Sequence, residues 1–267
     1  TLTSSSAASD VYKRQIYWHS DVVQQNKLLT FFAKKIEKKL IQKSRCVIFA
    51  TKAHREYSNQ DFSNFETRIL PYTILNEQQA DLTFNRRKKI KRSQRIRVLF
   101  IGRLVGYKGI EVILNLASCS FDQIDISIVG NGPLEKKIKL HKTYNRNVFL
   151  HTNQNNNQLE SFFEKSDLLI LPSINKAEMF GIVQLEAFSR GLPVVTTRMN
   201  ESGINYVNTD GISGMSFING DHNDLKQKIL DVYACTKKYQ PDSIKRYYKN
   251  NYSNDAFRAK LFKIFED

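Results

Sequence analysis

The chain has 267 residues, of which 41% are hydrophobic and 25% are charged, which is typical of a folded protein with about two domains. It contains no run of 18 or more apolar residues, and its three cysteines, Cys46, Cys119 and Cys235, are isolated, so neither a membrane-spanning helix nor a disulfide scaffold is predicted. The net charge is +15, and residues 1–95 hold 19 Lys and Arg against 8 Asp and Glu. That part of the chain is therefore expected to face an anionic membrane surface, a nucleic acid or an anionic substrate.

The first predicted domain is short. Residues 1–15 are rich in Ser, Ala and Thr without apolar periodicity, and we predict a non-native or disordered tail there. Short apolar runs then alternate with helical patterns, which is typical of a parallel sheet with crossover helices. These elements predict a partial α/β domain over residues 16–85, with a strand at 16–18, a helix at 21–43, a strand at 46–50, a helix at 52–58 and a strand at 67–71.

The next ten residues, 86–95, read Arg-Arg-Lys-Lys-Ile-Lys-Arg-Ser-Gln-Arg. They have no apolar face and stand between two α/β regions, so we predict a basic interdomain linker. Two functional alternatives remain open for this run: a cationic segment that faces lipid headgroups, and a nucleic-acid-binding patch.

Residues 96–250 form a second predicted α/β series, in which six apolar strands alternate with helices, as in a doubly wound parallel sheet. A last helix within residues 251–267 is expected to pack back toward the first domain through Phe257, Leu261 and Ile264. The predicted strands are 98–102, 126–130, 148–151, 168–172, 194–197 and 215–218, and the predicted helices are 110–117, 134–141, 158–165, 181–189 and 224–235.

Ligands of such sheets bind beyond the carboxyl ends of the strands, so the loops there are the places to look. After the first strand, Gly102 is followed by two cations, Arg103 and Lys108, which are suited to grip a diphosphate, although a solvated basic loop is equally consistent with the pattern. After the second strand, Gly130-Asn-Gly132-Pro133 is half of a dinucleotide-binding pattern, and a tight turn explains it as well.

The loop after the fourth strand presents Glu178, and a helix is predicted to begin near Phe180. Gly181 leaves the amides of the first turn open to an anion. Glu186 follows about 7–8 Å further along the helix axis, at about 1.5 Å per residue, which leaves room for a diphosphate between two acids that bind sugar hydroxyls. The alternative for Glu186 is a solvated helical acid, but its neighbours are apolar.

Together these motifs resemble a known family. Residues 178–194 contain Glu178 and Glu186 in a Glu-x7-Glu arrangement that resembles the signature of retaining GT-B-fold glycosyltransferases of family 4, the glycosyl transferases group 1. The loops at 102–109 and 130–133 look like the family's diphosphate-binding loop and the turn that follows it. The resemblance covers about residues 96–265 and, more weakly, residues 16–75.

The resemblance implies a GT-B fold: two Rossmann-like doubly wound parallel-sheet domains, of which the first is incomplete here. Family members carry further strands before the matched segment, so we expect this chain to be truncated at its N-terminal side, with an open sheet edge that promotes association.

The resemblance also implies roles. Arg103 and Lys108 are expected to bind the donor diphosphate, Glu178 the transferred sugar and Glu186 the ribose. Backbone amides of Phe180, Gly181 and Ile182 are expected to contact phosphate or sugar, and Gly102 is expected to bind the donor as part of the diphosphate loop. The base is expected near Gly132 and residues 151–153, where His151 stands at a position that is usually glycine.

In the first domain, Tyr17-Trp18-His19-Ser20-Asp21 resembles the acceptor-side segment whose histidine faces the donor sugar. His19 is therefore predicted to be catalytic, and local hydrogen bonding of its ring is the alternative.

The expected function is transfer of a sugar, with retention, from a nucleoside-diphosphate sugar to a glycan or lipid-linked acceptor, as in cell-envelope polysaccharide synthesis. No metal and no cofactor are expected, because the nucleotide sugar is a substrate. We expect a cytoplasmic protein that binds no nucleic acid, with attachment to the inner face of an anionic membrane as an option. An inactive nucleotide-binding remnant and a nucleic-acid-binding protein are the alternative functions.

Overall fold

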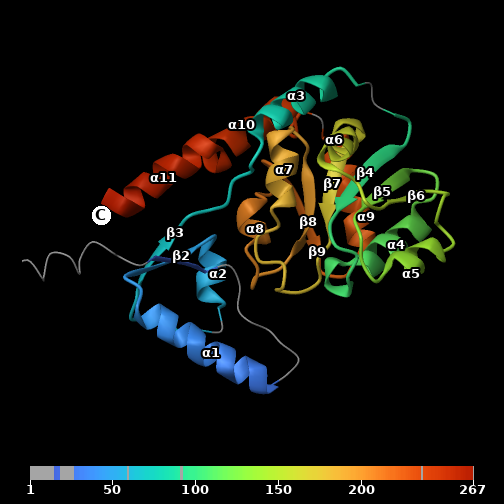
Figure 1. Cartoon of the computed structure of the whole chain (residues 1–267). Helices are drawn as coiled ribbons and strands as arrows, with labels where there is room; N and C mark the ends of the chain where they lie inside the picture. Colours follow the sequence, from blue (N-terminus) through green and yellow to red (C-terminus); the bar gives the residue numbers. More distant parts are fainter. Residues whose placement is uncertain (1–14, 19–26, 59, 91–92, 236, 267) are drawn as a thin grey trace, which may run out of the picture.

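The computed structural model describes residues 15–18, 27–58, 60–90, 93–235 and 237–266. They form two α/β units, one built on a three-stranded sheet and one on a six-stranded sheet, and all strand pairs are parallel (Figure 1). This architecture confirms the predicted α/β class with two parallel-sheet units, of which the first has three strands in the described residues.

The first unit has the strand order β1-β2-β3. Its central strand is buried on both faces. Val47 and Phe49 pack with Trp18 and Phe62 on one face. Cys46 and Ile48 pack with Leu70 on the other face. Gln15, which was predicted to belong to the tail, is instead the first residue of β1 and pairs with Cys46. The elements are β1 (Gln15–Trp18), α1 (Lys27–Gln42), β2 (Cys46–Phe49), α2 (Lys52–Glu56) and β3 (Glu66–Ile69).

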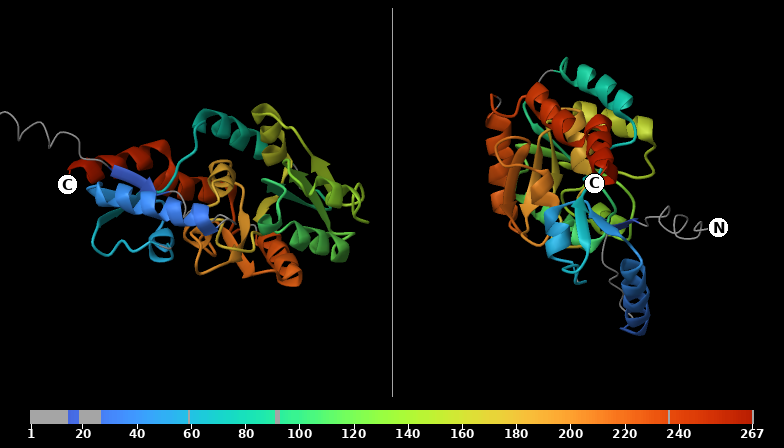
Figure 2. Two further views of the ribbon diagram at one scale, coloured as in Figure 1. Left: turned by 60° about the horizontal axis from the view of Figure 1, so that its bottom comes forward. Right: turned by 90° about the vertical axis from the view of Figure 1, so that its left-hand side faces the viewer.

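The second unit has the strand order β6-β5-β4-β7-β8-β9. Successive strands are therefore added on one side of β4 up to β6 and on its other side from β7 onward, so the strand order reverses between β4 and β7. All six predicted strands are confirmed, each to within two residues at both ends, because their apolar runs are buried between helices on the two faces (Figure 2). The strands are β4 (Ile96–Ile101), β5 (Ile124–Val129), β6 (Val148–His151), β7 (Leu168–Leu171), β8 (Val194–Arg198) and β9 (Gly214–Ile218).

The helices of the second unit fall into two packed groups. In one group α4 packs beside α9, and in the other α3, α6, α7 and α10 contact one another. They are α3 (Glu77–Arg87), α4 (Ile110–Cys119), α5 (Glu135–Lys139), α6 (Asn156–Lys165), α7 (Val183–Ser189), α8 (Ile204–Val207), α9 (His222–Ala234), α10 (Pro241–Tyr252) and α11 (Asn254–Glu266), with a short 3₁₀ helix η1 (Gly106–Lys108). No helix in the described ranges has the length and apolar character needed to cross a bilayer.

The basic run at 86–95 differs from the predicted linker. Arg86 and Arg87 belong to α3, which Asn76 caps by accepting a hydrogen bond from the Gln79 amide at 3.0 Å and which buries Ala80 and Phe84. The helix forms because this capped, partly apolar turn packs on α6 and α7 of the second unit. Residues 77–87 therefore form a helix that packs on the second unit, and Arg86 and Arg87 are part of it.

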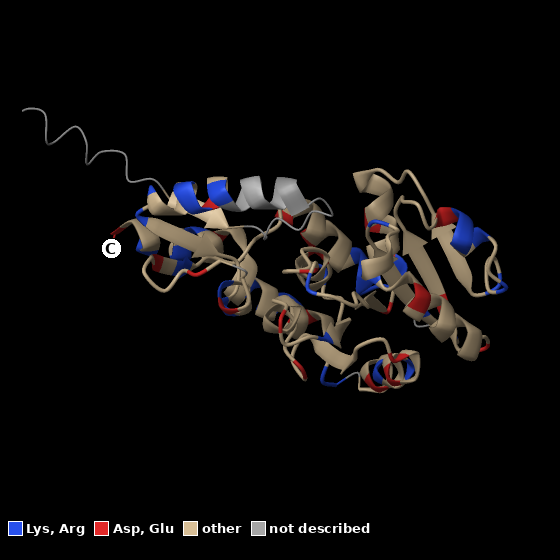
Figure 3. Cartoon of the chain, turned by 90° about the horizontal axis from the view of Figure 1, so that it is seen from below, with Lys and Arg blue, Asp and Glu red and all other residues tan. Residues whose placement is uncertain are grey.

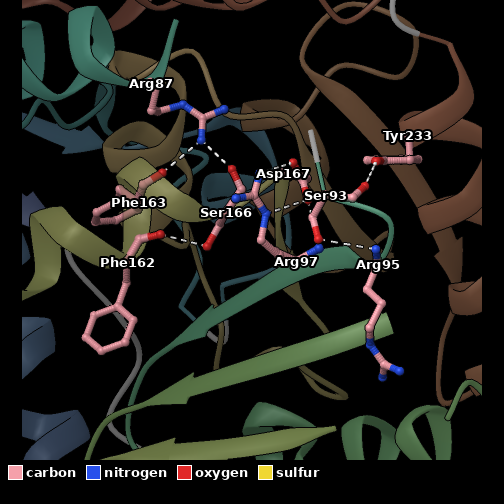
Figure 4. Close-up of polar contacts among 9 residues, drawn as sticks. All are labelled: Arg87, Ser93, Arg95, Arg97, Phe162, Phe163, Ser166, Asp167 and Tyr233. Atoms are coloured by element: carbon pink, nitrogen blue, oxygen red, sulfur yellow. Dashed lines mark hydrogen bonds and ion pairs between the residues drawn. The ribbon is translucent and has the colours of Figure 1, made fainter. Parts of the chain in front are cut away.

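The cations of this run are also bound within the molecule. Arg87 donates to the carbonyl oxygens of Phe163 and Ser166 (Figure 4), and Arg86 Nε lies 2.7 Å from a Glu164 carboxylate oxygen. Lys88 pairs with Asp242 at 3.0 Å, and Arg95 pairs with Asp125 at 2.8 Å. These contacts argue against a free lipid-facing or nucleic-acid-binding segment at the described positions of the run.

Several contacts join the described residues of the two units. Tyr72 stacks on Tyr17 at 5.4 Å between ring centroids and meets Phe180 edge-on at 4.8 Å. At Gly203, an added Cβ would lie 2.6 Å from the Thr51 hydroxyl oxygen. The helix α11 returns to the first sheet (Figures 1 and 2), where Phe257, Leu261 and Ile264 pack against Cys46, Ile48 and Leu70.

Candidate functional site

The loops that follow β4, β5 and β7 come together where the strand order reverses. Gly109 has φ +75°, and a Cβ on it would lie 1.9 Å from the Pro172 carbonyl oxygen; a Cβ on Gly130 would lie 1.9 Å from the carbonyl oxygen of Gly102. A Cβ on Gly132 would lie 2.6 Å from the Leu104 carbonyl oxygen. These glycines are needed because the loops press against one another, which matches the tight-turn explanation of residues 130–133.

Two predicted site residues meet across these loops. Lys108 ends η1, after β4, and its ammonium forms an ion pair with the carboxylate of Glu178, which follows β7. Their side chains are only 14% and 9% exposed. The hydroxyl of Ser173 donates to the same carboxylate oxygen at 2.8 Å, and the Ser202 hydroxyl donates to the Glu178 carbonyl oxygen. Glu178 is therefore held from both its side chain and its main chain.

Arg103 stands five residues before Lys108 in the same loop. Its side chain is exposed, and no ion pair or side-chain hydrogen bond to it occurs among the described residues. It is thus a cation in the same loop as Lys108 that can turn toward an anionic ligand without breaking an ion pair or side-chain hydrogen bond to the described residues.

The backbone amides that were predicted to contact phosphate or sugar lie in the turn before α7. The helix begins at Val183 rather than near Phe180, because Gly181 takes φ +69° and the chain turns there first. Phe180 is buried against Tyr72, whereas Ile182 is 46% exposed. Within the described part of the chain, the amides of Gly181 and Ile182 donate no backbone hydrogen bond, so both are available to an acceptor.

Glu186 lies in the first turn of α7. Burial raises the pKa of its carboxyl group; Arg190 opposes this shift, and the nearby Glu160 adds to it. Among the described residues, no hydrogen bond or ion pair reaches the Glu186 carboxylate. Glu186 is therefore half-buried rather than a fully solvated helical acid, and its carboxylate has no hydrogen bond or ion pair to the described residues.

His151 ends β6 beside the turn at 130–133. Its carbonyl oxygen accepts a hydrogen bond from the Gly130 amide at 3.0 Å, and its ring tilts against Phe162 at 4.5 Å between centroids. Burial lowers the pKa of the imidazole, so the ring is neutral at neutral pH. It presents a flat, uncharged surface where the nucleobase was expected.

Some site residues were not singled out from the sequence. Ser173 directly follows the recognised strand and Pro172, so proximity in sequence was a usable signal. Ser202 is 24 positions from Glu178, and nothing in the sequence linked the two. His19, the predicted catalytic histidine, lies outside the described residues; β1 ends immediately before it at the buried Trp18. Among the described residues, no group of three or more His, Cys, Asp or Glu is arranged to hold a metal ion.

The doubly wound parallel sheet beside a smaller parallel-sheet unit is the arrangement of a GT-B-type fold. The chain belongs to the family Glycosyl transferases group 1, whose family model matches residues 81–252, more than half of the chain.

It is 30% identical over 138 residues to the "Uncharacterized glycosyltransferase MJ1178" of Methanocaldococcus jannaschii, a match that covers 50% of this chain and 37% of that protein. The chain thus spans well under half of that relative.

Solved structures give the same fold at low identity. The sucrose-phosphate synthase (tll1590) from Thermosynechococcus elongatus superposes with a TM-score of 0.74 at 17% identity, over 97% of this chain and 69% of that one. Anabaena Alr3699/HepE in complex with UDP and glucose superposes with a TM-score of 0.72 at 14% identity, over 95% of this chain and 71% of that one.

Proposed function

We propose that this chain is the donor-binding part of a retaining hexosyltransferase that moves a sugar from a nucleoside diphosphate to a glycan or lipid-linked acceptor. The observation that carries the proposal is the Lys108–Glu178 pair beside the unpaired Arg103, at the point where the order of parallel strands reverses. The Anabaena neighbour, whose complex holds UDP and glucose, supports a nucleotide-sugar donor.

The proposed chemistry is electrostatic. When the bond between sugar and diphosphate breaks, negative charge grows on the β-phosphate, and fixed cations that stabilise this charge lower the barrier. Arg103 and Lys108 take that role, and the amides of Gly181 and Ile182 add donors. Glu178 accepts hydrogen bonds from sugar hydroxyls, and Glu186 accepts them from the ribose. No covalent enzyme intermediate and no cofactor are proposed, and His19 is proposed to contact the sugar from the acceptor side.

The first unit supports an acceptor at a membrane. In α1 the side chains of Lys38 and Lys39 are exposed, together with Ile36 at 60% and Leu40 at 54%. Figure 3 shows basic positions, in blue, along the described part of this helix. A helix that exposes lysines beside apolar residues is suited to an anionic lipid surface. Peripheral attachment to the inner face of the membrane, with a lipid-linked acceptor of envelope polysaccharide synthesis, is therefore part of the proposal.

The test is turnover of a full-length version of the protein with UDP-, GDP- and ADP-sugars, after thermal-shift screening against UDP, GDP and ADP. Arg103→Ala and Lys108→Ala are each expected to lower kcat by about 10²–10³-fold, as the loss of one charge-stabilising donor does elsewhere. Lys136→Ala, an exposed lysine on α5, is the control and should leave kcat unchanged. Unchanged turnover in both site variants would contradict the proposed role of Arg103 and Lys108 in stabilising the leaving diphosphate. Nucleotide binding without donor hydrolysis or sugar transfer would indicate a non-catalytic remnant.

A further inference from the structure

A cavity near the candidate site is not used by the proposed donor chemistry. It has a volume of about 480 Å³, within the range of about 300–1,000 Å³ that is typical of small-molecule sites. We call it the tyrosine pocket, and the residues that define it are Tyr57, Arg198, Asn200, Asn205, Tyr206 and Asp210.

The tyrosine pocket is tied to the loop that carries Glu178. Its inner wall contains the segment after β8 and the helix α8. Between these, the Ser202 hydroxyl donates to the Glu178 carbonyl oxygen, and the Gly203 amide donates to the Met179 carbonyl oxygen at 3.0 Å. The opposite wall is Tyr57, the C-cap of α2 in the first unit. The pocket is thus shared by the two units, with only one loop between it and the Lys108–Glu178 pair.

The deeper polar groups of the pocket are already hydrogen-bonded. The Asn205 side chain accepts from the Met199 amide at 2.7 Å and donates to the Thr197 carbonyl oxygen at 3.0 Å. The carboxylate of Asp210 accepts from the Ser216 hydroxyl at 2.6 Å. These hydrogen bonds fix the side chains of the wall and leave the side chains at the rim available to a ligand. The pocket is therefore already formed before a ligand binds.

The rim combines flat aromatic surface with polar groups. The side chains of Tyr57 and Tyr206 are 41% and 49% exposed, and Asn200 and Arg198 are exposed beside them. Arg198 forms no ion pair among the described residues. Because Arg198 and Asp210 both line the cavity, the formal charges of its lining residues cancel. This composition does not suit a nucleotide diphosphate, which needs excess positive charge.

A sugar ring matches these features. Its C–H faces are apolar and pack on aromatic rings, while its hydroxyls both donate and accept hydrogen bonds, as tyrosine, asparagine and arginine side chains require. We propose that the tyrosine pocket binds a pyranose ring of the glycan acceptor. This inference rests on the proposed function only in naming that glycan as the acceptor; the sugar-binding site itself does not depend on catalysis.

The test is saturation-transfer NMR on the full chain with four probes: methyl α-glucoside, methyl α-mannoside, N-acetylglucosamine and galacturonic acid. At least one of them is expected to bind, and Tyr206→Ala and Tyr57→Ala should each weaken that binding about fivefold or more through loss of ring packing. Tyr206→Phe, which keeps the ring, should stay within about twofold of the unmodified chain. Leu140→Ala, at a residue that is 76% exposed on another part of the surface, should have no effect.

Binding of UDP and GDP, measured by calorimetry on the same proteins, separates the two proposals. Nucleotide binding together with either no sugar binding or sugar binding that both alanine variants leave unchanged would overturn the pocket and leave the proposed function standing. Sugar binding that Tyr206→Ala weakens, with no nucleotide binding, would support the pocket and count against the proposed function.

Discussion

Glu186 is a residue whose proposed role in ligand binding conflicts with the stability of the fold. Its side chain is half-buried, burial raises the pKa of the carboxyl group, and the charge of Arg190 offsets this shift only in part, without a hydrogen bond or ion pair to the carboxylate among the described residues. A buried acid of this kind is stabilised when a ligand hydroxyl donates to it, which fits the proposed ribose contact.

We therefore predict opposite effects of Glu186→Gln on stability and on binding. Because the folded-state pKa is raised, the stability that this group contributes is fully present below the unfolded value of about 4.3 and is lost as pH rises through the folded value. The variant should be more stable than the unmodified chain at pH 8, with a difference that shrinks toward pH 4.5, while its nucleotide affinity falls. Urea unfolding across this pH range and nucleotide titration check both effects, and a pH-independent difference in stability would contradict the first.

For single residues, the sequence indicated which residues lie near one another but not how they contact each other. Lys108 and Glu178 were expected to line one site, and the structure brings them together. Their mutual ion pair was not expected, because separate roles toward phosphate and sugar do not imply contact. The sequence allowed two explanations for Gly130 and Gly132: close approach of a ligand, or a tight turn. The choice between them depends on the positions of Gly102 and Leu104 in space, which the residue types alone do not specify.

Among the helices, one buried acid connects three elements of the second unit. Glu160 on α6 accepts from Thr83 on α3 at 2.6 Å and from Arg190 Nε, after α7, at 2.8 Å. Glu160 and Arg190 have side chains that are only 8% and 7% exposed. Since α7 carries Glu186, this network fixes the helix that presents the proposed ribose contact.

Glu160→Ala should destabilise the chain by about 3–5 kcal/mol, because it leaves the Arg190 charge buried without a partner. The control is Glu111→Ala, which removes the acid of a surface pair with Lys137 and should change the free energy of unfolding by less than about 0.5 kcal/mol. Urea denaturation of both variants checks the contrast. Equal effects would show that burial of the pair does not matter.

The sequence identified the strands well and some helices poorly. Apolar runs such as residues 168–171 are continuous and buried on both faces, so their composition alone marks them. The helices α3 and α10 were missed because their apolar residues are few and spaced along polar, basic or tyrosine-rich segments. Their helical structure depends on packing against α6 and α7, which becomes visible only when the fold is assembled.

For the molecule as a whole, α11 is the element that joins the end of the chain to the first sheet. That sheet has only three strands and a small core, so contacts from α11 supply a large part of its apolar cover. The order of the two units was predictable from the sequence. Their junctions were not, because contacts such as Tyr72 with Phe180 join residues more than 100 positions apart.

Leu261→Ala should therefore loosen the first unit while leaving the second intact. Truncating a side chain that packs on Cys46, Ile48 and Leu70 removes apolar contacts from that sheet in particular. Hydrogen exchange of β2 and β3 should accelerate, whereas that of β4 and β5 should not change. The neighbouring Phe262→Ala, at a side chain that is 65% exposed on the same helix, should leave both unaffected. Equal acceleration in both units would count against this division.

Charge at the molecular scale gives a further prediction. Replacing Lys38, Lys39 and Lys43 of the first unit with Glu should abolish binding to vesicles that contain anionic lipid, and binding of the unmodified chain should weaken as salt is raised. Replacing Lys136 and Lys139 of α5 with Glu changes charge on the second unit and should leave most of the binding intact. Co-sedimentation at two salt concentrations measures both, and salt-independent binding would contradict an electrostatic attachment.

The main-chain contacts at Gly109 and Gly130 have a consequence for how this protein can diverge. Since any side chain there would collide with a neighbouring carbonyl oxygen, the three loops can change only as a set, whereas Gly106 has open space around it. If the proposed function holds, donor preference can change through the side chains of residues such as His151 and Arg103, while the contacts at Gly109 and Gly130 keep the backbone of these loops unchanged.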